Sequence, residues 1–410
     1  MSTLVQTPAD IRSPRDDDRI RLLVLAVGYP SERHVAGTFH QEQFRLLAAA
    51  GFHVTVVVPT PWVPWPLGAN PRWRRYVDVP PSQRDGDIDI LRPRYVTVPR
   101  ENAWFAPDLS QYLAVRALHL PRPDIVHGFH VLPLGAVASW LAQHWQVPYL
   151  TTAMGDDVNV YPHLMSRNLR LLKRVVRGAA ATFATGATLA RETERLTGCE
   201  VENLPIGVSE RRFRHRLARG EARARLGLPS ERTIALYVGR MVPGKGLEEL
   251  AQALEGLRDS SILCVAIGAG PSRRALDHLP NAIYLGPRSP DEVAAAMAAA
   301  DMLVLPSHSE GLPTVVMEAA LADLPVVTTN ARGCIDLAAD GRALVVPVGD
   351  ATALRRALEF VAADPQAARQ RARAMRAYVE TCCTLETNTA RLIDRYRSIF
   401  AQSHCCKERE

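Results

Sequence analysis

The stretch "DMLVLPSHSEGLPTVVMEAALADLPVVTT", residues 301–329, contains a complete strand–loop–helix–strand unit. "DMLVLP" and "LPVVTT" are apolar runs of strand length, and Pro313 suits the first turn of the mostly apolar helix between them. Two parallel strands that are joined by a helix predict a sheet covered on both faces. The loop "SHSEGL" then follows the carboxyl end of a strand, where ligands bind in such sheets.

The same alternation of apolar runs and helices continues on both sides of this unit. It predicts an α/β protein with two Rossmann-like domains of parallel strands. The predicted strands of the first series are 20–27, 53–59, 124–128, 148–152 and 181–184, and those of the second are 233–239, 261–268, 282–286, 301–306, 324–329 and 343–348.

An Arg-rich segment at 209–231, between the two series, is expected to be a surface linker plus a helix. The expected organisation is therefore a disordered lead-in (1–18), an N-terminal Rossmann-like domain (19–215), a C-terminal Rossmann-like domain (216–385), and a C-terminal helix and tail (386–410).

Composition is that of a soluble globular protein, with 410 residues, 47% hydrophobic and 22% charged. Seven cysteines, an odd number, fit no disulfide framework and predict free thiols. The polar N-terminus lacks the features of a secretion signal, so a cytoplasmic location is expected. The net charge of +6 suits an anionic partner.

Two glutamates, Glu310 and Glu318, lie on either side of a Gly-Leu-Pro turn. The loop places Glu310 at the sheet edge, and Glu318 lies more than a turn into the helix. A carboxylate accepts two hydrogen bonds from vicinal hydroxyls, which suits a ribose or a hexose. The amides of Gly311, Leu312 and Thr314 at the helix start favour an anion beside these carboxylates. The alternative is that Glu318 is a solvated helix position.

A second motif, "GRMVPGKG" at 239–246, follows the first strand of the second series. Arg240 and Lys245 flank its Pro-Gly turn. A planar guanidinium and a mobile ammonium together suit a diphosphate. Rossmann topology predicts that this loop and Glu310 lie at the same sheet edge.

Together, "VGRMVPGKG", "IGAGP", "YLG" and "PSHSEGLPTVVMEAALADLPVVTT" resemble retaining GT-B glycosyltransferases that carry the E-x7-E motif, of the glycosyltransferase family 4 type. "GYPSERHVAGTFHQEQ" resembles the start of bacterial members that build cell-surface polysaccharides. The resemblance implies two domains whose sheets face a central cleft, with the acceptor bound by the N-terminal domain (19–215) and the nucleotide-sugar donor by the C-terminal domain (216–385). It also implies sugar transfer from a UDP- or GDP-sugar to a glycan or lipid-linked acceptor.

The resemblance further implies roles for individual residues. Arg240 and Lys245 would hold the donor diphosphate and stabilise the leaving group, and Glu310 would bind hydroxyls of the donor sugar. Glu318 would bind the ribose, and Arg288, in "PRSPDE", lies in the base-binding region of the family. Further donor contacts are expected from Gly37, Gly239, Gly311, Leu312 and Thr314.

The implied mechanism needs no cofactor besides the donor. The acceptor hydroxyl attacks on the face from which the nucleoside diphosphate leaves, which retains the anomeric configuration, and the leaving diphosphate acts as the base. No metal is expected, because Arg240, Lys245 and the helix amides neutralise the phosphates. Asp156–Asp157 lacks the spacing of a metal-binding pair and is expected to be a structural loop.

The loop after "PYLTT" departs from the family pattern, because Met154 replaces a histidine that meets the donor sugar in many members. His127 and His130 lie near the same predicted edge and are candidates to compensate, with Asp156 as a further sugar or acceptor contact. The alternative for the histidines is a satisfied polar role at a strand end.

Two segments bear on the acceptor. Residues 165–177, "MSRNLRLLKRVVR", place basic residues at helical spacing, which fits either an anionic membrane surface or the solvent face of a Rossmann helix. The Pro- and Trp-rich segment 59–76 offers aromatics for stacking on sugars or for packing among themselves.

Three hypotheses about function remain open from the sequence. The leading one is a retaining glycosyltransferase, cytoplasmic or peripheral at the inner face of a membrane. The others are a nucleotide-sugar epimerase and a sugar-nucleotide-binding protein that has lost activity, the latter motivated by Met154. Nucleic-acid binding is not expected, because the basic residues are scattered and no recognised module is present.

Overall fold

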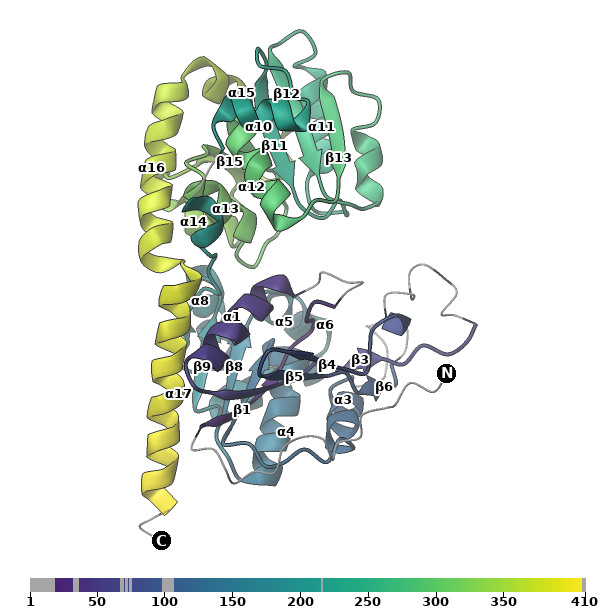
Figure 1. Cartoon of the computed structure of the whole chain (residues 1–410), viewed down its shortest axis with the longest axis vertical. Coiled ribbons are helices and arrows are strands. Elements are labelled where there is room, and N and C mark those ends of the chain that lie inside the picture. The colour runs from purple at the N-terminus through teal and green to yellow at the C-terminus, as the bar shows by residue number, and fades with distance from the viewer. Residues whose placement is uncertain are drawn as a thin grey trace. The chain divides into compact units, whose positions relative to one another are not determined.

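The computed structural model describes residues 19–31, 37–66, 70, 73, 76–97, 107–214 and 217–407 (Figure 1). The chain forms two compact units, one of Met1–Ile206 with Asn388–Glu410 and one of Gly207–Thr387. The division falls earlier in the chain than the expected boundary at 215/216. The lead-in expected at 1–18 lies outside the described residues.

The first unit is built on a sheet with the strand order β10-β9-β8-β7-β1-β2-β5-β4. All neighbours are parallel except the β4–β5 hairpin. The strands are β1 (Arg21–Leu25), β2 (His53–Val57), β4 (Ser82–Asp85), β5 (Ile88–Leu91), β7 (Ile125–Phe129), β8 (Tyr149–Ala153), β9 (Ala181–Ala184) and β10 (Glu202–Asn203), and a separate pair is β3 (Thr60–Pro61) and β6 (Arg94–Tyr95).

Helices cover both faces of this sheet. One apolar cluster joins the strands to α4, α7 and α8, and another joins them to α1 and α17, the long C-terminal helix (Figure 1). The helices are α1 (Thr38–Ala49), α3 (Pro107–Arg116), the π-helix η3 (Val131–Gly135), α4 (Ala136–Trp145), α5 (Asp156–Asn159), α6 (Tyr161–Leu164), α7 (Ser166–Gly178), α8 (Ala187–Thr197) and α17 (Leu385–Lys407).

The second unit has an all-parallel sheet with the order β13-β12-β11-β14-β15-β16. Its strands are β11 (Thr233–Val238), β12 (Ile262–Ile267), β13 (Ala282–Gly286), β14 (Met302–Leu305), β15 (Val326–Thr329) and β16 (Leu344–Val346). Its helices are α9 (Arg211–Arg214), α10 (Arg219–Leu226), α11 (Leu247–Glu255), η4 (Pro271–Ala275), α12 (Pro290–Ala299), α13 (Thr314–Leu321), α14 (Cys334–Ala338), η5 (Ala339–Gly341), α15 (Ala351–Ala363) and α16 (Pro365–Cys382).

Strand β11 shows how the second sheet is buried on both faces. Ile234 and Leu236 pack in one cluster with α10, α12, α13 and α16, and Ala235 and Tyr237 pack in another with α11 and α15. Because neighbouring side chains of a strand point to opposite faces, its near-continuous apolar run fills both layers. The α/β class and the parallel sheets predicted from the sequence are confirmed.

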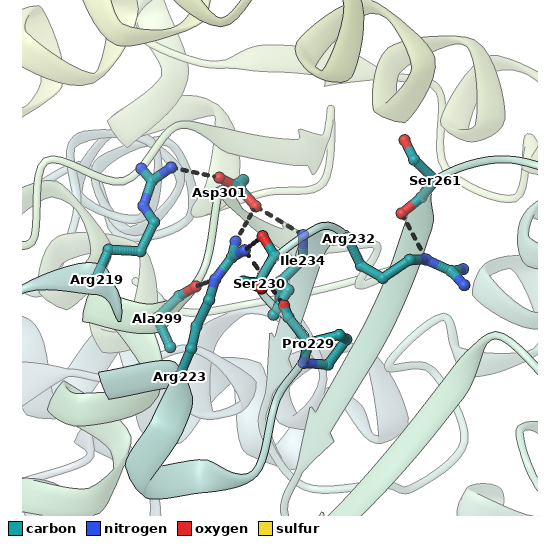
Figure 2. A network of polar contacts seen from close by, with 9 residues as sticks. All are labelled: Arg219, Arg223, Pro229, Ser230, Arg232, Ile234, Ser261, Ala299 and Asp301. Carbon is teal, nitrogen blue, oxygen red and sulfur yellow. Dashed lines mark hydrogen bonds and ion pairs between the residues drawn. The ribbon is translucent and has the colours of Figure 1, made fainter. Parts of the chain in front are cut away.

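The helix expected in the Arg-rich segment is present as α10, but it packs in the core of the second unit rather than on a surface linker. Ala222 is fully buried, and Arg223 is 6% exposed. The Arg223 guanidinium donates to the Ala299 carbonyl at 2.9 Å and pairs with the Asp301 carboxylate at 2.7 Å (Figure 2). Asp301 also accepts the backbone N–H of Ile234 at 2.8 Å, so one carboxylate ties α10 to the start of β11.

Helix α17 returns the chain to the first unit and is fixed there by a buried polar contact. The Tyr396 hydroxyl lies 2.5 Å from Nδ1 of His127, and Nε2 of His127 lies 2.8 Å from the Thr152 hydroxyl. At the surface, the Arg391 and Arg397 side chains donate to the carbonyls of Asn203 and Ala50. The last helix therefore completes the first unit's core, although it follows the second unit in sequence.

We expect His127 to make the stability of the first unit depend on pH. Burial lowers the pKa of His127 to about 3, whereas the unfolded chain has an ordinary value near 6.5. The unfolded state therefore binds a proton that the folded state does not, so stability is complete above about pH 6.5 and is lost as the pH falls. Between about pH 6.5 and 5 the loss is about 2 kcal/mol.

The measurement is urea unfolding at several pH values, with His127→Gln as the comparison. Tryptophan fluorescence reports on the first unit, because all six tryptophans precede residue 150. The variant should show a shallower pH dependence than the wild type. Buried His40, whose pKa is also lowered by burial, contributes to the slope that remains. Equal slopes would contradict the assignment of the wild-type pH dependence to His127.

Candidate active site

The candidate site lies at the carboxyl edge of the second sheet. Strands β11 and β14 are parallel neighbours, so the loops that follow them, 239–246 and 306–313, leave the same edge. Each loop leads into a helix, α11 or α13. The topology thus brings together the two motifs that the sequence predicts to share an edge.

An ion pair joins the two loops. The Lys245 ammonium lies 2.7 Å from Oε1 of Glu310, and the same carboxylate oxygen accepts the hydroxyl hydrogen of Ser307 at 2.7 Å. The Lys245 and Glu310 side chains are 17% and 15% exposed. A largely desolvated pair of this kind interacts more strongly than a surface pair. It keeps a cation and a hydrogen-bond acceptor side by side at the sheet edge.

A second set of contacts holds the same loops from the opposite side. The His308 amide donates to the Gly244 carbonyl at 2.9 Å, and its ring Nε2 lies 2.9 Å from the Glu249 carboxylate at the start of α11. The Glu310 amide donates to the Arg332 carbonyl at 3.2 Å, which adds the loop after β15. Three successive loops of the edge are therefore connected through the segment that carries Glu310.

Close backbone packing explains one glycine of the "GRMVPGKG" loop. Gly246 has φ +72°, and a Cβ there would lie 2.0 Å from the Pro306 carbonyl oxygen. Gly244 has φ +83°, but a Cβ there would meet no atom within 4 Å. The two loops approach each other through Gly246, and this approach is what lets Lys245 reach Glu310.

We expect Gly246→Ala to destabilise the second unit by about 2 kcal/mol or more, because it adds a backbone clash to the cost of positive φ. Gly244→Ala, which carries only the cost of positive φ, should cost about 1 kcal/mol. Hydrogen exchange of the β11 and β14 amides measures the loss of stability in each of the two variants. Equal losses of protection would show that the loops do not need this close contact.

The start of α13 offers amide donors beside the ion pair. Within the described residues, the N–H groups of Gly311, Leu312 and Thr314 donate to no protein acceptor. Pro313 is the residue before the helix rather than in its first turn, with φ −72° and ψ 108°. Glu318 lies in the second turn and is half-buried, in a helix whose Val316, Met317, Ala319 and Ala320 are buried. Glu318 is therefore only partly open to solvent, on a helix that is otherwise mostly buried.

Arg240 and Gly239 lie directly after β11. The Arg240 side chain is exposed, and its carbonyl accepts the Tyr237 hydroxyl at 3.0 Å. The pKa of Tyr237 is raised, first by burial and then by the charge of Glu310, with an opposing contribution from Arg240. Both charged groups therefore act on one buried phenol, which keeps its proton and supports the loop.

Two predicted donor residues lie on other elements than the two loops of the ion pair. Arg288 is exposed after β13, two strands from β11, and pairs with Glu292 at 3.4 Å. Gly37 precedes α1 in the first unit with φ +87°, and a Cβ there would lie 2.5 Å from the Gly28 carbonyl oxygen. The approach of Gly28 is therefore enough to account for this glycine.

The structure corrects part of the set predicted around Met154. His127 is fully buried, and both ring nitrogens contact protein hydroxyls, so it is not a sugar contact but a satisfied core histidine. His130 is half-buried with Nδ1 2.9 Å from the Phe129 carbonyl. Met154 is half-buried against the cluster that includes α17, and Asp156 is exposed at the start of α5.

Asp157 has the structural role expected of the acidic pair, although it lies in a short helix rather than a loop. Its carboxylate accepts the backbone N–H groups of Val131, Met154 and Gly155 at 2.7–3.0 Å.

In the Trp-rich segment, Trp62 and Trp65 are 55% and 91% exposed. The alternative that the aromatic side chains of this segment pack among themselves is therefore wrong for Trp62 and Trp65.

Several residues of the site were not found from the sequence. Ser307, His308 and Glu249 contact the ion pair or its loop, and Tyr237 lies beneath Arg240. Cys334 is buried, and burial raises the pKa of its thiol to about 11, with a smaller effect of Glu310. Only Ser307 and His308 carried a signal, because they lie within the quoted loop.

The described residues contain no group of three or more His, Cys, Asp or Glu side chains placed to hold a metal ion. Nor does this part of the chain include a helix with the length and apolar character needed to cross a membrane.

Known proteins are similar to this chain in sequence. Residues 218–378 match the family described as "Glycosyl transferases group 1", and residues 36–207 match the "Glycosyl transferase 4-like domain". TuaC of Bacillus subtilis (strain 168), a glycosyltransferase named for teichuronic acid biosynthesis, is 35% identical over 346 residues, covering 83% of this chain and 88% of TuaC. This chain belongs to the group 1 glycosyl transferases.

Solved structures show the fold of this glycosyltransferase. Sucrose-phosphate synthase from Thermosynechococcus elongatus aligns with a TM-score of 0.77 at 22% identity, covering 94% of this chain and all (100%) of that one. HepE of Anabaena, in complex with UDP-glucose, aligns with a TM-score of 0.68 at 16% identity, covering 93% and 100%. These similarities confirm the predicted GT-B fold class.

Proposed function

We propose that this glycosyltransferase moves a sugar, with retention of anomeric configuration, from a nucleoside-diphosphate donor to a glycan or lipid-linked acceptor of a cell-surface polysaccharide. The observation that carries the proposal is the 2.7 Å contact of Lys245 with Glu310, which joins the loops after two neighbouring parallel strands. The similarity to TuaC supports the polysaccharide, and the UDP-glucose complex of the HepE fold relative supports the donor class.

In this proposal the diphosphate binds at the cation-rich end of the site. Lys245, Arg240 and the amides before α13 face the phosphates and supply fixed positive charge. Charge develops on the diphosphate as the bond to the sugar breaks, so these groups stabilise the transition state more than the bound donor. They neutralise the phosphates without a metal ion.

The carboxylates select the hydroxyl-bearing parts of the donor. Glu310 exchanges part of its contact with Lys245 for hydroxyls of the donor sugar, and half-buried Glu318 accepts from the ribose. The acceptor hydroxyl attacks on the face that the diphosphate leaves, and the departing phosphate oxygen takes its proton. The new glycosidic bond then has the donor's anomeric configuration.

The test is a reaction with UDP-glucose and GDP-mannose, each with a polyprenyl-diphosphate-linked saccharide, with and without EDTA. Proton NMR of the product reports the anomeric configuration of the new glycosidic bond. We expect one donor to react, with retention and with the same rate in EDTA. An inverted product would overturn the proposed retention of configuration. A rate abolished by EDTA would overturn the proposed independence from metal ions. Epimerised donor formed without acceptor would instead favour an epimerase.

A further inference from the structure

A hollow lies at the amino-terminal edge of the second sheet, the edge opposite to the candidate active site. It encloses about 300 Å³, which is at the lower end of the range for small-molecule sites. The parallel neighbours β11, β14 and β15 begin there, with Thr233, Asp301 and Pro325 in the lining. We call this cavity the amino-edge hollow. Since six-residue β11 spans about 20 Å, the hollow and the Lys245–Glu310 pair lie at opposite ends of the same strands.

One part of the lining is apolar and keeps some contact with solvent. It consists of half-buried Leu217, Ala298, Ala322 and Ala362 and of exposed Pro365. Three of these five residues are alanines, whose short side chains leave room for a ligand. An apolar or aromatic group that covers them removes apolar surface from water on both sides, which favours its binding.

Two carboxylates line the hollow, and each is paired with an arginine that lies outside the lining. Asp301 pairs with the buried guanidinium of Arg223 at 2.7 Å (Figure 2). Asp323 pairs with Arg376 of α16 at 2.7 Å. A third carboxylate, that of Asp364, lies just before α16 and caps that helix. Asp301 and Asp323 therefore add no net negative charge to the hollow.

Two further arginines of the lining give the hollow an excess of positive charge. Arg219 contacts Asp301 through one nitrogen, Nη1, and its side chain is 46% exposed. Arg369 is exposed and forms no ion pair with any described residue. The Thr233 hydroxyl makes no hydrogen bond in the described part of the chain. Most of the unused hydrogen-bonding capacity is thus that of cationic donors, which fits an anion.

We propose that the amino-edge hollow binds a small organic phosphate, with the phosphate at Arg219 and Arg369 and the apolar or aromatic part against the alanines. A phosphomonoester carries a charge of about −1.5 to −2 at pH 7 and three strong acceptor oxygens. Two guanidinium groups and the Thr233 hydroxyl match both properties. Inorganic phosphate would use only the arginines, and an uncharged ring would use only the alanines. The hollow is a second ligand site, separate from that of the proposed donor.

The experiment is isothermal titration calorimetry of the full chain with phenyl phosphate, beside inorganic phosphate and phenol. Phenyl phosphate should bind about tenfold more tightly or better than either, because it alone uses both parts of the lining. Arg369→Gln should weaken its binding about tenfold or more, the effect of losing one charge-assisted hydrogen bond. Ala298→Leu keeps every charge, fills part of the hollow and should weaken binding by a similar factor. The matched control, Arg373→Gln, removes an exposed charge one turn farther along α16, outside the lining, and should leave the affinity nearly unchanged.

Lys245→Ala separates this site from the proposed donor site, which also attracts phosphates. Binding of phenyl phosphate should be kept in Lys245→Ala and weakened in Arg369→Gln, and the reverse pattern would place the probe at the donor edge and overturn the proposal. A wild type that does not bind phenyl phosphate, or binds it no better than inorganic phosphate, would also overturn it. So would equal weakening in Arg369→Gln and Arg373→Gln. Thermal stabilisation by the donor nucleotide should be the same in Arg369→Gln as in the wild type, so a failure of this proposal is distinguishable from a failure of the proposed function.

Discussion

Replacing Lys245 with alanine is expected to lower kcat by about 10²- to 10³-fold, the effect of removing one fixed charge-stabilising group from a desolvated site. Lys245 is 17% exposed and bonded to Glu310, so its ammonium is already positioned at the carboxyl edge of β11 and β14. In the proposed mechanism its interaction strengthens as negative charge grows on the leaving diphosphate, so we expect kcat to change more than KM. Initial rates of nucleoside diphosphate release measure the effect.

Two variants serve as controls for the Lys245 prediction. Lys245→Arg keeps the charge and should recover part of the lost rate. Arg288→Gln removes an exposed cation from the same sheet edge, two strands away, and should change kcat less than tenfold. A Lys245→Ala enzyme with near-normal kcat would remove this residue from the catalytic set.

Replacing Asp301 with alanine is expected to destabilise the second unit by about 3 kcal/mol, because it leaves the guanidinium of Arg223 buried without its counter-ion. The side chain of Arg223 is 7% exposed and that of Asp301 is 21% exposed. The change also removes the acceptor of the Ile234 amide at the start of β11 (Figure 2). Hydrogen exchange of β11 and β14 amides should show the loss, while tryptophan fluorescence of the first unit should not.

The control for the Asp301 prediction is a change at Arg219, the second arginine that pairs with Asp301. Arg219 pairs with the same carboxylate at 2.7 Å, but its side chain is 46% exposed. Arg219→Gln should therefore cost less than about 1 kcal/mol. If Arg219→Gln and Asp301→Ala destabilised the second unit by similar amounts, the burial of Arg223 would not be the cause of the large effect expected for Asp301→Ala.

The fold was predictable because the strands of both units are buried on both faces. Runs such as "TIALYVG" carry apolar side chains to two helix layers and therefore stand out in the sequence. The β4–β5 hairpin was missed because its strands carry charged residues on an exposed edge. The burial of Arg223 was missed because an arginine that pairs across the core has the same local pattern as a solvated one.

The site was predictable where one loop carries the chemistry, and less so where packing decides. The quoted stretch located Glu310, and parallel topology brought Lys245 to it. The sequence could not decide between a sugar contact and a satisfied core role for His127, because its partner, Tyr396, lies 269 residues away on a helix that returns from the other unit. No local spacing reveals such a contact.

The most direct test of the account is thermal stability with saturating UDP, GDP or ADP, with and without magnesium, for the wild type and Glu318→Gln. A nucleotide at about a hundred times its dissociation constant stabilises the unit that binds it by about 2.7 kcal/mol. The account predicts a shift with one nucleotide, independent of magnesium and reduced in the variant. No shift with any nucleotide would contradict the donor site at the Lys245–Glu310 edge.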